Sequence, residues 1–259
     1  MIFKAHFSSS ASNLYEVTAS NGRRLLIECG CTWKLLQKAL DYKLDGIDGC
    51  LLSHSHKDHS KAVEDVLLAG IPIYSSLPTF EALGVAEDRH ANIVGDKDRF
   101  EVGDTFEVFS FALFHDVPCL GFIVHDKSSD ENLLFVTDTS HIKQRFGIAF
   151  DIIAICCGYD GAVLAKRQET GDINEALAIR LLTAHMERNV TKRYIAECCC
   201  LDKCTEIYLL HMSGGNISQE KTRKEFEDEF MRTTLIAGRR QGIPSFPLPE
   251  PPANIKDKP

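Results

Sequence analysis

The segment HSHKDH, residues 54 to 59, places four side chains that can bind a metal within six residues. Imidazole and carboxylate groups together suit zinc or a similar divalent ion. The segment follows an apolar run that ends at Leu52 and precedes a helical pattern that begins near Ser60, so a loop between two rigid elements would hold its side chains. The alternative is a polar loop that only starts a helix, with Asp58 as its cap. The density of ligand types favours a metal site.

Three further candidate ligands each follow an apolar run that predicts a strand: His115, Asp138 and His211. Two metal ions need more ligands than the loop supplies, and strand ends can deliver them. A single histidine after a strand is more commonly a core or surface residue. The dense loop is what favours the metal interpretation for these three residues.

The elements that must position these side chains are strands and helices in two successive mixed halves. Strands are expected at residues 14–18, 24–28, 47–52, 71–74, 105–111, 121–125, 132–136, 151–156 and 206–211, and helices at 31–42, 60–68, 172–188, 191–202 and 218–232. Asp172 and Glu175 have the spacing of a capping box at the start of a long helix. This order predicts one domain, residues 1–242, with sheet packed between helices. Six of the nine prolines lie from Pro244 onward, so residues 243–259 are predicted to be an extended or disordered tail.

The composition, 44% apolar and 25% charged, is that of a soluble globular protein. A formal charge of −8 argues against a surface built to hold long nucleic acid, although a small phosphate site remains compatible with it. The sequence contains no apolar run of membrane-spanning length, so no membrane partner is expected. Ten cysteines include the adjacent pair at 156–157 and the triplet at 198–200, spacings that suit a reducing compartment and a cytoplasmic location. On a helix, Ile195, Cys198 and Cys199 share one face, which favours core packing over a zinc knuckle.

The HxHxDH loop resembles that of the metallo-β-lactamase-fold hydrolase superfamily, and the resemblance extends over residues 1 to about 230. In that superfamily a His, an Asp and a second His follow the loop in the order of His115, Asp138 and His211. Within it, the chain looks most like the single-domain YycJ (WalJ)-like branch, on the segments at residues 8–15 and 211–216. The resemblance implies an α/β (α+β) fold, a four-layer αββα sandwich.

The resemblance also implies two divalent metal ions, zinc with manganese as the alternative, and a ligand set. One ion would be held by His54, His56 and His115, the other by Asp58, His59 and His211, with Asp138 between them. Two cations that share a solvent molecule lower its pKa and stabilise an attacked phosphoryl or carbonyl group. Asp58 could in addition orient the resulting hydroxide.

Two departures from the superfamily pattern concern residues near the expected site. Glu28 stands where an Asp is usual, and we expect it to accept a hydrogen bond from a ligand imidazole. The segment from Cys156 to Asp160 replaces a Glu-x-Asn-Tyr-Asp pattern. His185 lies where the branch often has a histidine; it could protonate a leaving group, or it could pack within a helix beside Leu181 and Leu182.

These features favour a binuclear metal-dependent hydrolase that cleaves phosphodiesters with a metal-bound hydroxide, as a nuclease or a nucleotide phosphodiesterase. The alternatives are a cyclic-nucleotide phosphodiesterase of the phage anti-Pycsar type and a glyoxalase II-like thioester hydrolase. His59 argues against β-lactam hydrolysis, and the short spacing from Asp138 to His211 excludes the inserted domain of the β-CASP nucleases. A non-catalytic module would be expected to lack some of the ligands. The expected partner is a nucleotide or nucleic-acid substrate, with a homodimer as a further alternative.

Overall fold

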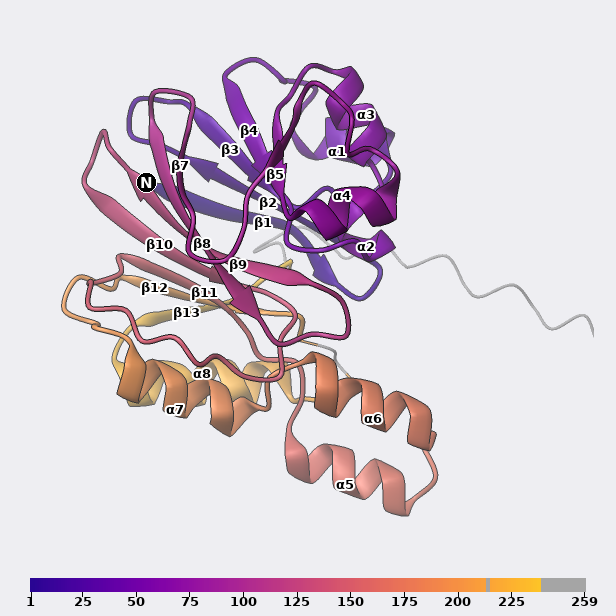
Figure 1. Ribbon diagram of the computed structural model, residues 1–259. Helices are drawn as coiled ribbons and strands as arrows, with labels where there is room; N and C mark the ends of the chain where they lie inside the picture. Colours follow the sequence, from indigo (N-terminus) through magenta and orange to yellow (C-terminus); the bar gives the residue numbers. More distant parts are fainter. Residues whose placement is uncertain (213–214, 239–259) are drawn as a thin grey trace, which may run out of the picture.

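Two mixed β-sheets form the centre of the structure, a computed structural model that describes residues 1–212 and 215–238 (Figure 1). The first sheet has the order β1-β2-β3-β4-β5-β6 and the second the order β13-β12-β11-β10-β9-β8-β7. The strands of the first sheet are β1 Ile2–Ser9, β2 Ser12–Thr18, β3 Arg24–Ile27, β4 Ile47–Leu51, β5 Ile73–Ser75 and β6 Ala91–Ile93. Those of the second are β7 Arg99–Val102, β8 Phe106–Leu113, β9 Cys119–Asp126, β10 Glu131–Val136, β11 Ile152–Cys156, β12 Glu206–Leu210 and β13 Thr233–Ile236. The predicted tail, residues 243–259, lies outside the described residues.

Each sheet joins an antiparallel part to a parallel part. Strands β1 to β3 pair antiparallel and β3 to β6 parallel. In the second sheet, β7 to β10 pair antiparallel and β10 to β13 parallel. Because neighbouring parallel strands end at the same edge of a sheet, residues that follow β10, β11 and β12 are brought close together.

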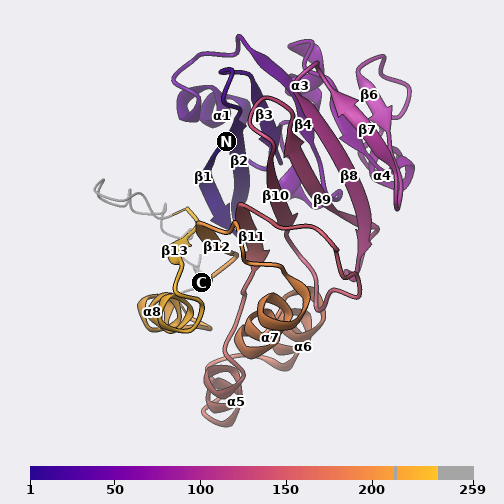
Figure 2. The ribbon, with the colours of Figure 1, turned by 90° about the vertical axis from the view of Figure 1, so that its left-hand side faces the viewer.

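The two sheets pack face to face, and helices cover the outer face of each (Figure 2). Tyr15 and Val17 of β2 point inward and share one apolar core with Phe122 and Phe135 of the second sheet. Neighbouring residues of a strand point to opposite faces of the sheet. Leu14 of β2 therefore points to the outer face, where it belongs to the apolar core beneath the helices that cover this sheet. This arrangement confirms the four-layer αββα sandwich.

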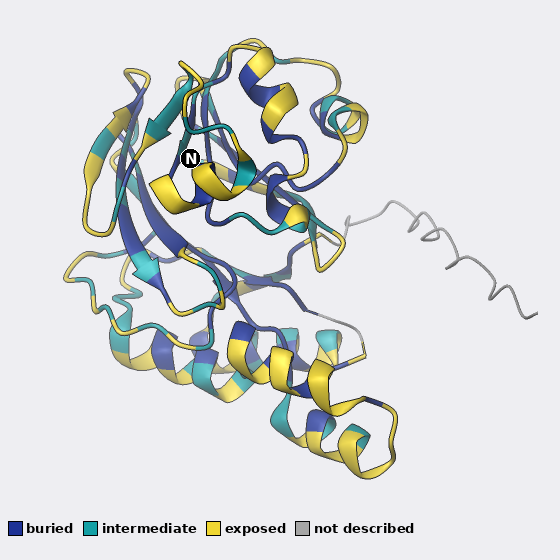
Figure 3. Ribbon diagram, turned by 45° about the vertical axis from the view of Figure 1, so that its right-hand side comes forward, coloured by how far each residue is buried: buried dark blue, intermediate teal, exposed yellow. Residues whose placement is uncertain are grey.

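Four helices cover the first sheet, whereas two helices and a helical hairpin cover the second. The first sheet is covered by α1 Trp33–Ala39, α2 Lys57–Ser60, α3 Val63–Leu68 and α4 Leu77–Leu83, and the second by α7 Arg188–Cys198 and α8 Gln219–Phe230. Helices α5 Gly161–Glu169 and α6 Glu175–Ala184 form a hairpin at one end of the second helical layer (Figure 1). The hairpin has a small core of its own, and much of its surface is exposed (Figure 3).

The helix expected at residues 172–188 is wrong at both ends. Asn174, not Asp172, caps α6, because its side chain accepts a hydrogen bond from the Leu177 amide. The helix ends at Ala184, and His185 has extended backbone angles. The following residues pair with the loop after β11, where the Gly158 amide donates to the Met186 carbonyl. This pairing draws the chain out of the helix, so the mid-helix position expected for His185 is wrong.

Other differences concern short elements. The helix expected at 60–68 is two helices, α2 and α3, and α2 begins within the HSHKDH segment, so Asp58 and His59 lie on a helical turn. Strands β1, β6, β7 and β13 and helices α4 and α5 were not predicted from the sequence. Among the described residues, no helix is both long and apolar enough to span a membrane.

Candidate metal centre

The candidate ligands gather at the edge where the parallel strands of both sheets end. The HSHKDH segment follows β4 of the first sheet, Asp138 follows β10 and His211 follows β12. His115 comes from the connection between the antiparallel strands β8 and β9. The structure thus brings together residues from four separate segments.

Backbone contacts hold the helical turn of the segment close to the end of β3. The Cys29 amide donates to the His59 carbonyl at 2.8 Å, and the Gly30 amide to the Asn13 carbonyl at 2.9 Å. A Cβ atom at Gly30 would lie 1.6 Å from the Asp58 carbonyl oxygen, so only glycine allows this approach. Neither the role of Gly30 nor that of Asn13 was predicted.

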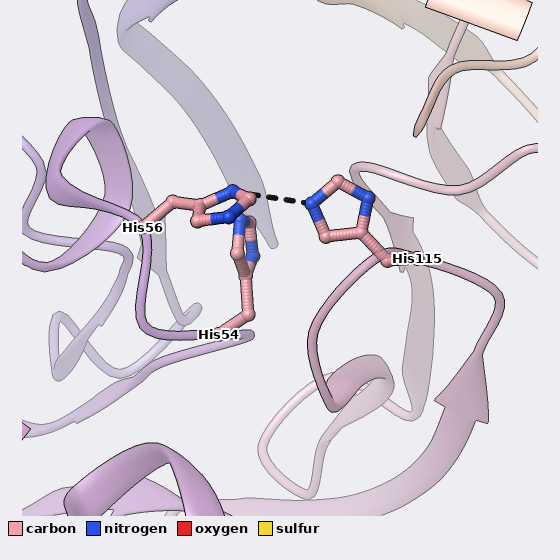
Figure 4. Close-up of side chains that lie close together, drawn as sticks. All are labelled: His54, His56 and His115. Atoms are coloured by element: carbon pink, nitrogen blue, oxygen red, sulfur yellow. Dashed lines mark hydrogen bonds between the residues drawn. The ribbon is translucent and has the colours of Figure 1, made fainter. Parts of the chain in front are cut away.

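His54, His56 and His115 form the first group of side chains (Figure 4). Their nearest ring nitrogens lie within 4.8 Å of one another, and His115 Nε2 lies 3.2 Å from His56 Nδ1. The Ser53 hydroxyl lies 2.8 Å from His54 Nδ1 and fixes that ring from behind. This leaves His54 Nε2 to face the other two histidines.

Asp138 is the centre of the second group. Its Oδ2 lies 3.4 Å from His59 Nε2, and its Oδ1 lies 3.1 Å from His211 Nε2. The Asp58 carboxylate lies 3.4 Å from the same His59 nitrogen. His54, His59 and Asp138 also meet within 4.8 Å, so the two groups adjoin through His54 and Asp138.

Groups outside the ligand set hold His59 in place. Glu28 Oε1 lies 3.3 Å from His59 Nδ1, an ion-pair distance, although neither atom has a hydrogen-bond partner among the described residues, so the expected hydrogen bond is not formed. The Asn13 side-chain amide lies 3.0 Å from His59 Nε2 and donates to the Asp58 carbonyl at 3.1 Å. Asn13 belongs to the N-terminal segment that resembles the YycJ branch, but no pattern in the sequence indicated its contact with His59.

His185 also faces this centre. Its Nδ1 lies 3.6 Å from Asp138 Oδ1, and its ring stacks near that of His211 with centroids 5.4 Å apart. A Cβ atom at Gly158 would lie 2.6 Å from His185 Cβ, so the glycine gives this ring its room. His185 therefore lies beside the candidate ligands, one residue after the end of α6, and not within a helix.

The electrostatics of the site depend on burial. Burial lowers the pKa of His54 well below its usual value and that of His211 to about 4, so both rings are neutral at pH 7. Burial alone would raise the pKa of Asp138, but His211 and His59 hold it well below its usual value. Burial would lower the pKa of His59, but Glu28 and Asp138 raise it strongly. A divalent cation at His59 would therefore displace a proton.

The residues present fit a divalent metal. His54 Nε2 and His211 Nε2 are buried and have no hydrogen-bond partner among the described residues. Buried nitrogen atoms of this kind are rare unless a ligand or ion satisfies them. Neutral imidazoles and ionised carboxylates are the protonation states that bind zinc and similar ions.

The geometry and the comparisons together place the chain in a family. Residues 23–186 match the Beta-lactamase superfamily domain, and the chain belongs to this family. Exodeoxyribonuclease YycJ of Bacillus anthracis is 29% identical over 153 residues, which cover 55% of this chain and 56% of that protein. Anti-Pycsar protein Apyc1 of Bacillus phage 010DV004 is 46% identical over 52 residues, 20% of each chain. The chain thus matches about half the length of the first of these relatives and a fifth of the second.

A solved structure shows the same fold over nearly the whole chain. The metallo-β-lactamase fold protein YhfI from Bacillus subtilis superposes with a TM-score of 0.68 and 19% sequence identity, covering 91% of this chain and 95% of that one. This likeness and the sequence relatives confirm both the resemblance to the metallo-β-lactamase superfamily and its YycJ-like branch. The protein is thus a member of this superfamily with the metallo-β-lactamase fold.

Proposed function

We propose that the protein is a binuclear metal-dependent phosphodiesterase, acting as a nuclease or on nucleotides. The observation that supports the proposal is that seven candidate ligands, from segments far apart in the sequence, lie in two groups that adjoin through His54 and Asp138. The ligands would be His54, His56 and His115 for one ion, and Asp58, His59 and His211 for the other, with Asp138 between them. The names of the curated relatives, a deoxyribonuclease and an anti-Pycsar protein, support a phosphodiester substrate. We also propose that residues 1–242 act as one hydrolase domain, since both sheets contribute ligands.

The residues of this chain would divide the work between binding and proton transfer. Bound cations would lower the pKa of a water molecule to give the nucleophile and would stabilise the charge on the phosphoryl group. The pKa of Asp58 is lowered: burial raises it, but His59 outweighs burial, so the carboxylate is ionised and can accept a hydrogen bond from that water. His185, on the other side of Asp138, would donate a proton to the leaving oxygen. Zinc is the expected metal and manganese the alternative.

A substrate panel tests the proposal. Metal-loaded protein would be assayed with bis-p-nitrophenyl phosphate, single-stranded and duplex DNA, RNA, cyclic nucleotides and a glutathione thioester. We expect turnover of phosphodiesters, and we expect removal of the metal by a chelator to abolish it. Turnover of the thioester alone would overturn the proposal in favour of a glyoxalase II-like hydrolase.

The second candidate function is a cyclic-nucleotide phosphodiesterase. The match to the anti-Pycsar protein, 46% identity, is the specific observation in its favour, although it covers 52 residues. Selective turnover of cyclic nucleotides in the same panel, with none of DNA or RNA, would establish this candidate over the nuclease.

Two further expectations remain predictions. All ten cysteines are free thiols, which supports a reducing compartment such as the cytoplasm. Helix α6 exposes the apolar side chains Leu177, Ile179 and Leu182, which supports the expectation of a homodimer. Fractionation of cells and analytical ultracentrifugation of the purified protein would test these two expectations.

A further inference from the structure

Cys156 lies against the candidate metal centre but has no role in the proposed phosphodiesterase. It is the last residue of β11, beside Leu210 of β12, and the chain turns toward His211 one residue after that partner. Its side chain is fully buried. The thiol sulfur lies 3.7 Å from His185 Nδ1.

Three donor atoms of different types meet at this point. One atom each from Asp138, Cys156 and His185 lies within 4.8 Å of the other two. His185 Nδ1 is 3.6 Å from Asp138 Oδ1 and 3.7 Å from Cys156 Sγ. A tetrahedral zinc with bonds of about 2.3 Å to sulfur and about 2.0 Å to nitrogen or oxygen separates its donors by roughly 3.3–3.6 Å. The two separations from His185 are close to those values before any ion has drawn the ligands together, and the Asp138 and Cys156 donors lie within 4.8 Å of each other.

The neighbouring elements hold these donors rigidly. Asp138 follows β10, and Cys156 is the last residue of the adjacent parallel strand β11. The Gly158 amide bonds to the Met186 carbonyl at 3.0 Å, which ties the residue after His185 to the loop after Cys156. The sheet edge thus sets the position of Cys156, and the backbone pairing at Gly158 keeps the segment that carries His185 beside it.

We propose that Asp138, Cys156 and His185 form a three-donor site for one thiophilic divalent cation, such as zinc, beside the histidine groups. Thiolate, imidazole and carboxylate together favour zinc, cadmium or cobalt over magnesium or calcium. Because a bound cation deprotonates a coordinating thiol, binding releases the Cys156 proton to solvent. The site shares Asp138 with the proposed two-metal centre and uses Nδ1 of His185, so proton donation by His185 in the proposed reaction would fall to its Nε2. It does not require ions in the histidine groups.

Cobalt titration tests the site directly. Chelator-treated full-length protein would be titrated with Co²⁺ while the near-ultraviolet thiolate-to-cobalt charge-transfer absorption is followed. We expect the band in the wild-type protein and its loss in Cys156→Ser. His185→Asn is the second variant. We expect its apparent affinity for Co²⁺, measured by the growth of the band, to fall at least about tenfold because one of three ligands is lost.

Cys157→Ser is the matched control. Cys157 is equally buried and adjacent in sequence, but its thiol interacts with Thr191, and it belongs to none of the groups of metal-binding side chains found among the described residues. We expect this variant to keep the full band. A band of unchanged intensity in Cys156→Ser, or no band in the wild-type protein at saturating cobalt, would overturn the proposal.

A further variant separates this inference from the proposed function. His54→Ala removes a ligand of the histidine groups, and we expect it to abolish phosphodiester turnover while the thiolate band persists. If the two-metal proposal failed instead, cobalt-loaded wild-type protein would show the band without hydrolysing any phosphodiester.

Discussion

Two buried groups of ionisable side chains differ in whether their polar atoms have hydrogen-bond partners. On the outer face of the first sheet, Glu16 lies 2.7 Å from His6 Nε2 and 2.5 Å from Arg24 Nε, so its two carboxylate oxygens are both paired. At the candidate metal centre, His54 Nε2 and His211 Nε2 are buried without a hydrogen-bond partner among the described residues. The first group is complete as folded, whereas the second has donor atoms that a cation would satisfy.

Buried ionisable groups therefore serve two purposes in this fold: one group stabilises the folded chain, and the other can bind a cation. The Glu16 group satisfies its own members and can contribute only to folding. The metal centre leaves favourable pairings unmade, a cost that ligand binding can offset. Substitutions in the two regions should therefore affect different measurements.

Asp138→Ala gives the largest expected effect. Loss of the carboxylate between the two groups should lower metal content and reduce turnover of bis-p-nitrophenyl phosphate by more than about 100-fold, because even residues outside the ligand set typically cost 10–100-fold. Elemental analysis and steady-state kinetics measure the two effects. Asp130→Asn, an exposed carboxylate in the turn between β9 and β10, is the control and should leave both unchanged. Two ions per chain in Asp138→Ala would show that Asp138 does not bridge.

Gly30→Ala gives the second-largest expected effect, a loss of folding stability together with weaker metal binding. The new Cβ would lie 1.6 Å from the Asp58 backbone, which cannot yield as a side chain can, so we expect a loss of about 3 kcal/mol and weaker metal binding. Gly22→Ala is the matched control: Gly22 has φ +82° but no atom within 4 Å, so strain alone should cost about 1–2 kcal/mol and leave metal binding intact. Chemical denaturation and metal titration of both variants would decide the comparison. Equal effects would show that the Asp58 turn is not held by this contact.

Glu16→Gln should affect stability alone, by about 1–3 kcal/mol at neutral pH. Burial would raise the pKa of Glu16, but hydrogen bonds from His6 and Arg24 outweigh it and lower the pKa to about 2. Because the folded-state pKa is depressed, the stabilisation is present above the unfolded pKa, about 4.5, and is lost as the pH falls toward about 2. Urea denaturation from pH 7 to pH 2 should show the gap between wild type and variant closing over that range. A reduction in metal content would contradict the separation of the two regions.

Cys199→Ala should have the smallest effect, less than about 1 kcal/mol. Cys199 is partly buried against the core beneath the second sheet, and burial raises the pKa of its thiol to about 12. Thermal unfolding with and without metal would check the expectation that the stability change is small and independent of metal. A metal-dependent change would reopen the zinc-knuckle interpretation of the cysteine triplet.

Much of the fold could be predicted because parallel strands buried on both faces are continuous apolar runs. The strand at Ile152–Cys156 is fully buried and was predicted within one residue. Short edge strands such as Ala91–Ile93 have weaker patterns, and β6 is only partly buried. The end of α6 could not be predicted because Ala184 and His185 continue a helical pattern, and only pairing with the loop after β11 ends the helix.

By itself, the sequence determined the types, order and spacing of the candidate ligands, because HSHKDH and the residues after three strands are local patterns. Only the tertiary structure decided what lies around them. Asn13 reaches His59, Gly158 makes room for His185, and Cys156 joins Asp138 at the sheet edge. These contacts depend on strand register and on where a helix ends, and both are set by packing between segments far apart in the chain.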